Sequence, residues 1–343
     1  MLWLLTGFVI LVSLPLSLIL FFGVLHYYLR WRYLGYVIRI FQEKPLFIVP
    51  RGQPIDGEEV LLPTTHGLTL RGCYLKTKAE KRKGVILFGL EFGSNRWSCV
   101  PYCENLLQNG YDIFAFEMRG QGDSPSQLGY EPLQWLTDHE VNDCQTALKY
   151  LKERPDADPQ GIGFFGISKG AAAGLMAGAD DPWVRCFVTD GVFATYTTMI
   201  PYMRKWYSIY NEQSVLRGLA PTWYYGWMGQ AGLNRIARQR QCRFPHLEKA
   251  LPKLAPRPLL MIHGGGDTYI KPEMAQELFD RARAPKEFWL VDGAKHNQAL
   301  QLAKEEYERR VLDFFNTHLA QQPPAPMPPT APATTSPALA KTV

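Results

Sequence analysis

The sequence predicts an α/β protein with a mostly parallel central sheet, helices on both faces of that sheet, and one N-terminal transmembrane helix. Two observations carry this prediction. Along the middle of the 343-residue chain, short apolar runs alternate with stretches of helical pattern, as they do in parallel sheets that are covered on both faces. At the N-terminus, residues 2–29 carry no charged side chain, and about 20 apolar residues are enough for a helix to cross a bilayer.

The apolar run predicts a membrane anchor at residues 1–30, followed by a connector at 31–56. A cleaved signal peptide is the main alternative, but no Lys or Arg precedes the run and no small-residue cleavage site follows it. A buried core helix is the other alternative. Arg30, Arg32 and Arg39 follow the run among several aromatic residues. The positive-inside rule therefore predicts a single-pass membrane protein whose remaining chain lies on the cytoplasmic side.

Strands and helices are expected in regular alternation after an antiparallel hairpin at residues 58–75. The expected strands are 84–90, 111–118, 161–167, 185–191, 258–264 and 287–293, and the expected helices are 97–109, 131–153, 168–178 and 297–319. This pattern places the main domain at residues 57–320.

One long interruption breaks the alternation. Residues 193–255 hold no clean strand and are rich in aromatic side chains, so we expect a helical cap inserted over the sheet. Those aromatic side chains would either form the core of the cap or line an apolar pocket or membrane-facing surface that binds acyl chains. Residues 321–343 are rich in Pro, Ala and Thr and predict a disordered tail.

Ser168 lies in the segment GFFGISKG, between an expected buried strand and a run of small residues suited to a helix. The G-x-S-x-G pattern alone is also typical of an ordinary glycine-rich turn. Between a strand and a helix, however, it indicates a nucleophile elbow, in which the serine hydroxyl projects above the sheet. The backbone N–H of Lys169 would then point toward a developing oxyanion.

His296 and Asp267 are the residues expected to activate this serine. His296 follows the last strand, and Asp267 follows the strand before it, although an aspartate after glycines is also a common turn residue. Sites in parallel sheets form at the carboxyl ends of strands. We therefore expect Ser168 as nucleophile, His296 as base and Asp267 as the acid that orients the histidine.

The order Ser…Asp…His after successive strands resembles the α/β-hydrolase superfamily over residues 57–320. FEMRGQGDS resembles that superfamily's D-x-R-G-x-G-x-S segment, with Glu117 where aspartate is usual, while HGGGDTYIKPE and GAKHN are similar to its acid and histidine loops. The subgroup resembled is the lipase, esterase, thioesterase and serine-peptidase-like branch.

The oxyanion stretch departs from the superfamily, because Phe-Gly replaces the usual His-Gly after the third strand. The resemblance implies Leu90 as the second oxyanion donor, through its backbone N–H. Glu91 is unexpected beside an oxyanion, and we expect it to point away or to pair with Arg96. Lys169 also raises the alternative of a Ser–Lys dyad, but the S-x-x-K spacing is absent.

The sequence thus predicts a membrane-anchored serine hydrolase that cleaves a small-molecule or lipid ester or thioester through an acyl-enzyme on Ser168. No cofactor or metal is implied, and a net charge of +5 without a long basic block indicates no nucleic-acid partner. The six scattered cysteines are expected to be buried free thiols. The alternatives are a serine peptidase or an acyltransferase with the same triad, and a non-catalytic binding protein of this fold.

Overall fold

The computed structural model describes residues 2–44, 51–210 and 221–320. The predicted tail at 321–343 and part of the connector lie outside the described residues. Eight strands within the described chain form one sheet in the order β1-β2-β4-β3-β5-β6-β7-β8. The strands are β1 Glu58–Pro63, β2 Thr69–Leu75, β3 Gly84–Gly89, β4 Tyr111–Phe116, β5 Ile162–Ile167, β6 Val184–Asp190, β7 Leu259–Gly264 and β8 Lys286–Val291. β2 runs antiparallel to β1 and to β4, and the other neighbours are parallel, so the predicted hairpin and parallel sheet are confirmed.

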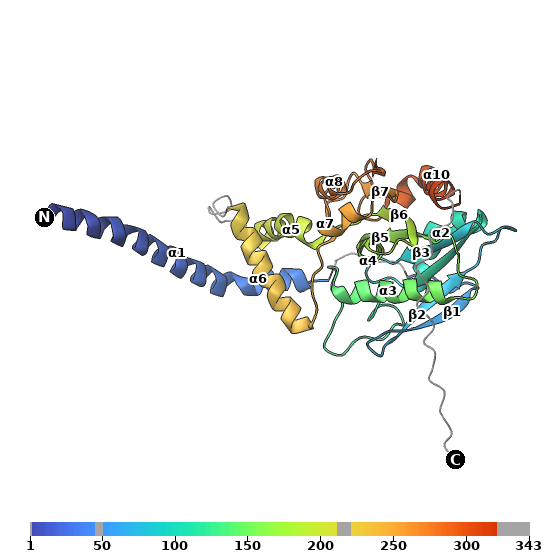
Figure 1. The fold of residues 1–343 in the computed structure, drawn as a ribbon, viewed down its shortest axis with the longest axis horizontal. Coiled ribbons are helices and arrows are strands. Elements are labelled where there is room, and N and C mark those ends of the chain that lie inside the picture. Colours follow the sequence, from blue (N-terminus) through green and yellow to red (C-terminus); the bar gives the residue numbers. More distant parts are fainter. Residues whose placement is uncertain (1, 45–50, 211–220, 321–343) are drawn as a thin grey trace, which may run out of the picture.

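Helices cover both faces of this sheet (Figure 1). They are α2 Val100–Gln108, α3 Asp138–Glu153, α4 Ser168–Ala179, α8 Pro272–Arg281, α9 Ala299–Leu302 and α10 Lys304–Phe315. Successive residues of a strand face opposite sides of a sheet. In β5, accordingly, Phe164 belongs to the core cluster that includes side chains of α3 and α4. Phe165 belongs to the cluster on the other face, with side chains of α2 and α10.

Two predicted helix boundaries were wrong. The helix expected from residue 131 begins only at Asp138, because Thr137 caps it: the Thr137 backbone N–H and hydroxyl both bond the Glu140 carboxylate, at 2.9 and 2.6 Å. The helix expected from residue 297 is divided into α9, α10 and a final turn at Asn316–Ala320. Asn297 has a φ of +55°, a left-handed conformation that a right-handed helix does not contain.

The cap inserted between β6 and β7 consists of helices, as predicted. It holds α5 Thr195–Tyr210, α6 Thr222–Arg240, α7 Leu247–Ala250 and the short 3₁₀ turn Leu251–Lys253. Residues 211–220, between α5 and α6, lie outside the described part of the chain. The cap has an aromatic and methionine core of its own, which includes Tyr202, Met203 and Tyr225.

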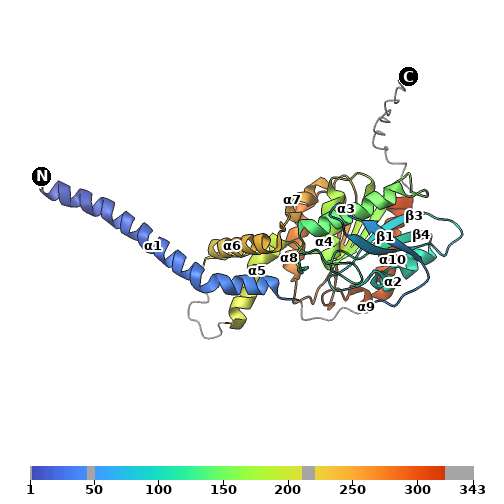
Figure 2. The same cartoon turned by 90° about the horizontal axis from the view of Figure 1, so that it is seen from below.

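Helix α1, Leu2–Gln42, runs without a break through residue 30, where the sequence suggested that an anchor ends and a connector begins. Its N-terminal half projects away from the rest of the protein, and its C-terminal half lies against the cap helices (Figures 1 and 2). Val37, Ile40 and Phe41 are buried in the cap core. By length and composition this helix can cross a membrane.

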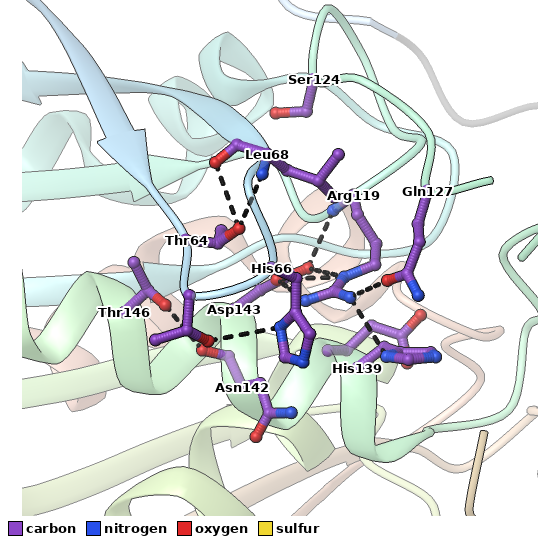
Figure 3. Close-up of polar contacts among 12 residues, drawn as sticks. Thr64, His66, Leu68, Arg119, Ser124, Gln127, His139, Asn142, Asp143 and Thr146 are labelled. Atoms are coloured by element: carbon purple, nitrogen blue, oxygen red, sulfur yellow. Dashed lines mark hydrogen bonds and ion pairs between the residues drawn. The ribbon is translucent and has the colours of Figure 1, made fainter. Parts of the chain in front are cut away.

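The loop after β4, which carries the segment resembling D-x-R-G-x-G-x-S, is held by two buried acidic residues. Glu117 accepts backbone N–H bonds from Arg96, Asp123 and Ser124, at 3.0, 2.7 and 3.1 Å. The Arg119 guanidinium bonds the Asp143 carboxylate on α3, as Figure 3 shows. A glutamate in place of the usual aspartate therefore still organises this loop.

A cavity of about 440 Å³ lies beside this cluster, lined by His66, His139 and the end of α6. His139 also contacts the Arg119 guanidinium at 3.1 Å (Figure 3). No member of the predicted triad lines this cavity. All six cysteines are buried and free, as expected.

Candidate active site

Ser168 stands at the junction of β5 and α4 with a φ of +53°. A non-glycine residue rarely adopts this conformation, and such outliers cluster at functional sites. The two flanking glycines make the turn possible: a Cβ on Gly166 would lie 2.6 Å from the Ala171 Cα, and one on Gly170 would lie 2.3 Å from the Leu90 carbonyl oxygen. The local geometry is that of a nucleophile elbow.

Ser168, His296 and Asp267 come together in a hydrogen-bonded chain at the carboxyl ends of their strands. The Ser168 Oγ lies 3.1 Å from Nε2 of His296, and Nδ1 of His296 lies 2.6 Å from Oδ2 of Asp267. The carboxylate accepts, so the bond to Asp267 assigns the imidazole proton to Nδ1. Nε2 is then left as the acceptor for the serine proton.

Asp267 is itself fixed by its own loop. Its Oδ1 accepts the backbone N–H groups of Tyr269 and Ile270, at 2.7 and 2.9 Å, and its side chain is almost fully buried. The turn role considered for this aspartate and its role beside His296 are therefore performed by different oxygens of one carboxylate. His263, the neighbouring histidine, bonds the Ile270 carbonyl at 2.8 Å, and burial lowers its pKa.

Aromatic rings of the cap side and the acid loop cover the triad. The His296 ring packs against Tyr269, with centroids 5.4 Å apart, and against Phe193, at 6.4 Å. Ser168 retains 5% of its surface. A nearly enclosed site excludes water and strengthens the electrostatic interactions inside it.

The two backbone segments that carry the suggested oxyanion donors pass close to each other. Lys169 is the second residue of α4, and the Leu90 backbone at the end of β3 touches the α4 backbone at Gly170. This close approach requires both Gly170 and its partner Gly89, whose added Cβ would lie 2.7 Å from the Gly170 carbonyl oxygen.

The Lys169 side chain points into the protein and forms a buried ion pair. Its Nζ donates to the Glu140 carboxylate at 2.8 Å and to the Leu133 carbonyl at 2.6 Å. Burial by itself would raise the pKa of Glu140, but the ammonium and the neighbouring hydroxyls outweigh burial and lower it. This ammonium is thus bonded away from the serine, which disfavours the Ser–Lys dyad.

Of the two expectations for Glu91, the pairing with Arg96 was wrong. Arg96 pairs with Glu59, Glu117 and Asp123. Glu91 instead accepts a 2.6 Å bond from the Asn297 side chain, directly after the triad histidine. Burial raises the pKa of Glu91, against the opposing influence of Asn297 and His296.

Asp190 is a second buried carboxyl near the triad, at the end of β6. It accepts a 3.0 Å bond from the Tyr307 hydroxyl, and burial raises its pKa to about 7. Sequence reasoning passed over this residue and over Asn297. The partners of Asp190 and Asn297 are Tyr307 and Glu91, more than a hundred positions away in the chain, so no local pattern signals either contact.

Comparisons with known proteins show which family and fold the chain resembles. A model of the prolyl oligopeptidase family matches residues 101–322. The uncharacterized protein YfhR of Escherichia coli (strain K12) is 24% identical over 278 residues, which cover 78% of this chain and 84% of YfhR. The polyketide transferase ATR5 of Stachybotrys chlorohalonatus is 24% identical over 294 residues, 76% of this chain and 97% of the relative.

Among solved structures, an esterase of Pyrococcus furiosus superposes with a TM-score of 0.59 at 21% identity, covering 81% of this chain and 100% of the esterase. The sheet order, the serine at the elbow and this likeness all indicate the α/β-hydrolase fold. Because the family model spans well over half of the chain, the protein belongs to the prolyl oligopeptidase family of α/β hydrolases.

Proposed function

We propose that this protein is a membrane-anchored serine hydrolase that cleaves carboxylic ester or thioester bonds. The observation that carries the proposal is the hydrogen-bonded chain from Ser168 through His296 to Asp267. Buried serines do not need a histidine and an aspartate in this order for stability, whereas nucleophilic catalysis at neutral pH does.

In this mechanism, Nε2 of His296 removes the Ser168 proton as Oγ attacks the acyl carbon. The backbone N–H groups of Lys169 and Leu90 hold the negative oxygen of the tetrahedral intermediate. His296 then protonates the leaving alcohol or thiol, and an acyl-enzyme on Ser168 remains. Water, activated by the same histidine, releases the acid and restores the serine.

Helix α1 supports the membrane part of the proposal. Its apolar run is long enough to cross a bilayer, and arginines and aromatic residues follow the run. By the positive-inside rule, the catalytic domain lies on the cytoplasmic side. The aromatic rings of Phe193 and Tyr269 beside His296 favour substrates with an apolar acyl group.

The proposal is tested with a fluorophosphonate probe and a short-chain p-nitrophenyl ester. We expect the wild-type protein to be labelled and to hydrolyse the ester, and Ser168→Ala to lose both properties. The exposed Ser208→Ala serves as the matched control and should behave as wild type. Equal labelling of Ser168→Ala would overturn the assignment of the nucleophile, and a folded wild type without turnover would favour the non-catalytic alternative.

Acyl transfer to an acceptor other than water is the second candidate, because the relative ATR5 carries the name polyketide transferase. A serine peptidase would use the same acyl-enzyme. Turnover in ¹⁸O-labelled water separates hydrolysis, of an ester or of a peptide, from transfer: hydrolysis places the label in the released acid, whereas transfer yields an unlabelled ester or amide of the acceptor.

A further inference from the structure

A cavity of about 1030 Å³ lies between helices α1 and α6, at the level where the apolar run of α1 ends. Side chains of both helices line it. We call it the interfacial groove and define it by Arg30, Trp31, Leu34, Trp227, Arg235 and Arg238. It lies outside the catalytic site, since no triad residue lines it.

The charge of the interfacial groove is entirely positive. Arg30 comes from α1, Arg235 and Arg238 come from α6, and among the described residues no Asp or Glu lines the cavity. All three arginines are exposed, and within the described part of the chain none of them makes an ion pair with another side chain. Another arginine at the end of α6 does form an ion pair: Arg240 lies 2.9 Å from the Glu131 carboxylate.

The groove is built by close packing of the two helices. The His26 ring stacks on Trp227 with centroids 3.9 Å apart. Farther along, α6 approaches α1 so closely that a Cβ on Gly232 would lie 2.7 Å from the Val37 Cγ1. The arginines of the two helices are thereby held on the two walls of one cavity.

The groove also has an apolar side. Trp31, Leu34 and Ile38 line it from α1, and the helix continues toward the N-terminus as a surface without charge. Trp223 and Trp227 of α6 are 66% and 50% exposed. Tryptophans with exposed rings and arginines together are typical of the headgroup level of a bilayer.

We propose that the interfacial groove binds the anionic headgroup of a membrane phospholipid. The arginines bond the phosphate and its acidic substituents, and the acyl chains lie along the apolar face of α1. The lipid fits because its charge complements the unpaired guanidinium groups while its tails complement the uncharged part of the helix, which an acidic peptide or free phosphate does not. The proposal rests on the membrane anchoring proposed above.

Lipid retention by the full-length protein tests the proposal. Detergent-solubilised protein is equilibrated with equal amounts of phosphatidylglycerol and phosphatidylcholine of identical acyl chains, and bound lipids are counted by native mass spectrometry. We expect wild type to retain mainly phosphatidylglycerol. Arg235→Gln and Arg238→Gln should each weaken that preference by about fivefold, the worth of one basic residue at an anionic surface.

Two variants serve as controls. Arg283→Gln removes the same charge from an exposed site after α8 and should leave the lipid preference unchanged. Ser168→Ala should also leave it unchanged, because the groove does not depend on catalysis. Equal binding of both lipids, an equal loss in Arg283→Gln, or displacement of the lipid by millimolar inorganic phosphate or an acidic peptide would overturn the proposal.

Flotation separates this proposal from the proposed function. Protein that fails to float with phosphatidylcholine liposomes after carbonate treatment lacks the anchor, and the groove proposal then falls with it. Protein that floats without preferring phosphatidylglycerol overturns the groove proposal alone. If the wild-type protein hydrolyses no ester but still prefers phosphatidylglycerol, the proposed chemistry is overturned and the groove proposal stands.

Discussion

Lys169 and the arginines of the interfacial groove are cations held in opposite ways. The Lys169 side chain is 1% exposed and is neutralised by Glu140 at 2.8 Å. Arg30, Arg235 and Arg238 are exposed, and no acidic residue from residues 2–44, 51–210 or 221–320 lines their cavity. One cation is part of the protein core, and the others are available to a ligand.

This difference shows that a basic residue next to the candidate nucleophile need not act on it, because its charge can be neutralised within the core. Because the Lys169 charge is cancelled by its own partner, the proposed mechanism leaves the charge that develops at Ser168 to His296 and to backbone N–H groups. In the groove nothing within the described residues cancels the charge, so its field extends to whatever lies there. Variants of Lys169 should therefore change stability, whereas variants of the groove arginines should change lipid binding.

The largest expected effect comes from the triad. His296→Ala and Asp267→Asn should lower kcat for a p-nitrophenyl ester by about 10⁴-fold, because the first removes the base and the second favours the wrong tautomer. Stopped assays with purified protein measure this loss. His318→Gln, a histidine in the last turn of the chain's described part, is the control and should keep wild-type kcat. Activity retained in His296→Ala would contradict the assignment of His296 as the base.

Lys169→Met comes next, and it should affect stability more than chemistry. Removing one partner of a buried ion pair costs about 3 to 5 kcal/mol, and the loss should be greatest above neutral pH, where Glu140 would be charged without a partner. Urea unfolding across pH measures it. The double variant Lys169→Met/Glu140→Gln should recover most of the loss. A large fall in kcat of the folded double variant would instead make the ammonium a participant in catalysis.

Asp190→Asn should change the pH dependence of stability. The pKa of Asp190 is raised by burial to about 7 in the folded protein, above its ordinary value near 4. The unfolded chain therefore releases this proton first, and folding free energy is lost as pH rises from about 4 to about 7. Asn resembles the neutral carboxyl and keeps an acceptor for Tyr307.

The unfolding free energy of Asp190→Asn should equal that of wild type near pH 4.5 and exceed it by about 1 to 3 kcal/mol at pH 8. Urea unfolding of both proteins at the two pH values provides the measurement. A variant that is less stable than wild type at both pH values would show that the charged carboxylate is the form the fold requires.

The smallest effect is expected at the contact between α1 and α6. Gly232→Leu should lower the unfolding free energy by about 1 to 2 kcal/mol, because its side chain meets Val37 in a packed contact. Gly35→Ala is the matched control: a Cβ there meets nothing within 4 Å, and a glycine removed from a helix interior should stabilise by up to about 1 kcal/mol. Thermal unfolding in detergent compares them. Shifts of the same sign in both variants would contradict the packing described for α6.

The sheet and the triad could be predicted because their signals are local. Each strand is a short apolar run, and the positions of Ser168, Asp267 and His296 follow from the rule that parallel strands end at one edge. Helix starts were less predictable, since Asp138 rather than residue 131 begins α3 through a cap at Thr137. The apolar pattern begins several residues before this cap, so the pattern alone suggested an earlier helix start.

Contacts between distant segments were beyond the sequence. Glu91 was expected to point away from the oxyanion or to pair with Arg96, its near neighbour. It accepts a bond from Asn297 instead, which follows the edge strand β8. The Glu140 partner of Lys169 is likewise set by how α3 packs on α4. Charge alone gives several possible pairings for each residue, and only the fold selects one of them.

Helix α1 decides where the chain can be shortened. A cut at residue 45 would strip Val37, Ile40 and Phe41 from the cap and uncover Trp135, whose ring lies 5.2 Å from that of Phe41. Such a fragment would lose the long apolar run of α1 and expose an apolar surface of the cap in its place. A fragment that begins near residue 31 keeps the part of α1 that packs against the cap, about 17 Å of helix up to Phe41. A shortened form of this protein that keeps the cap core intact therefore has to start inside the helix.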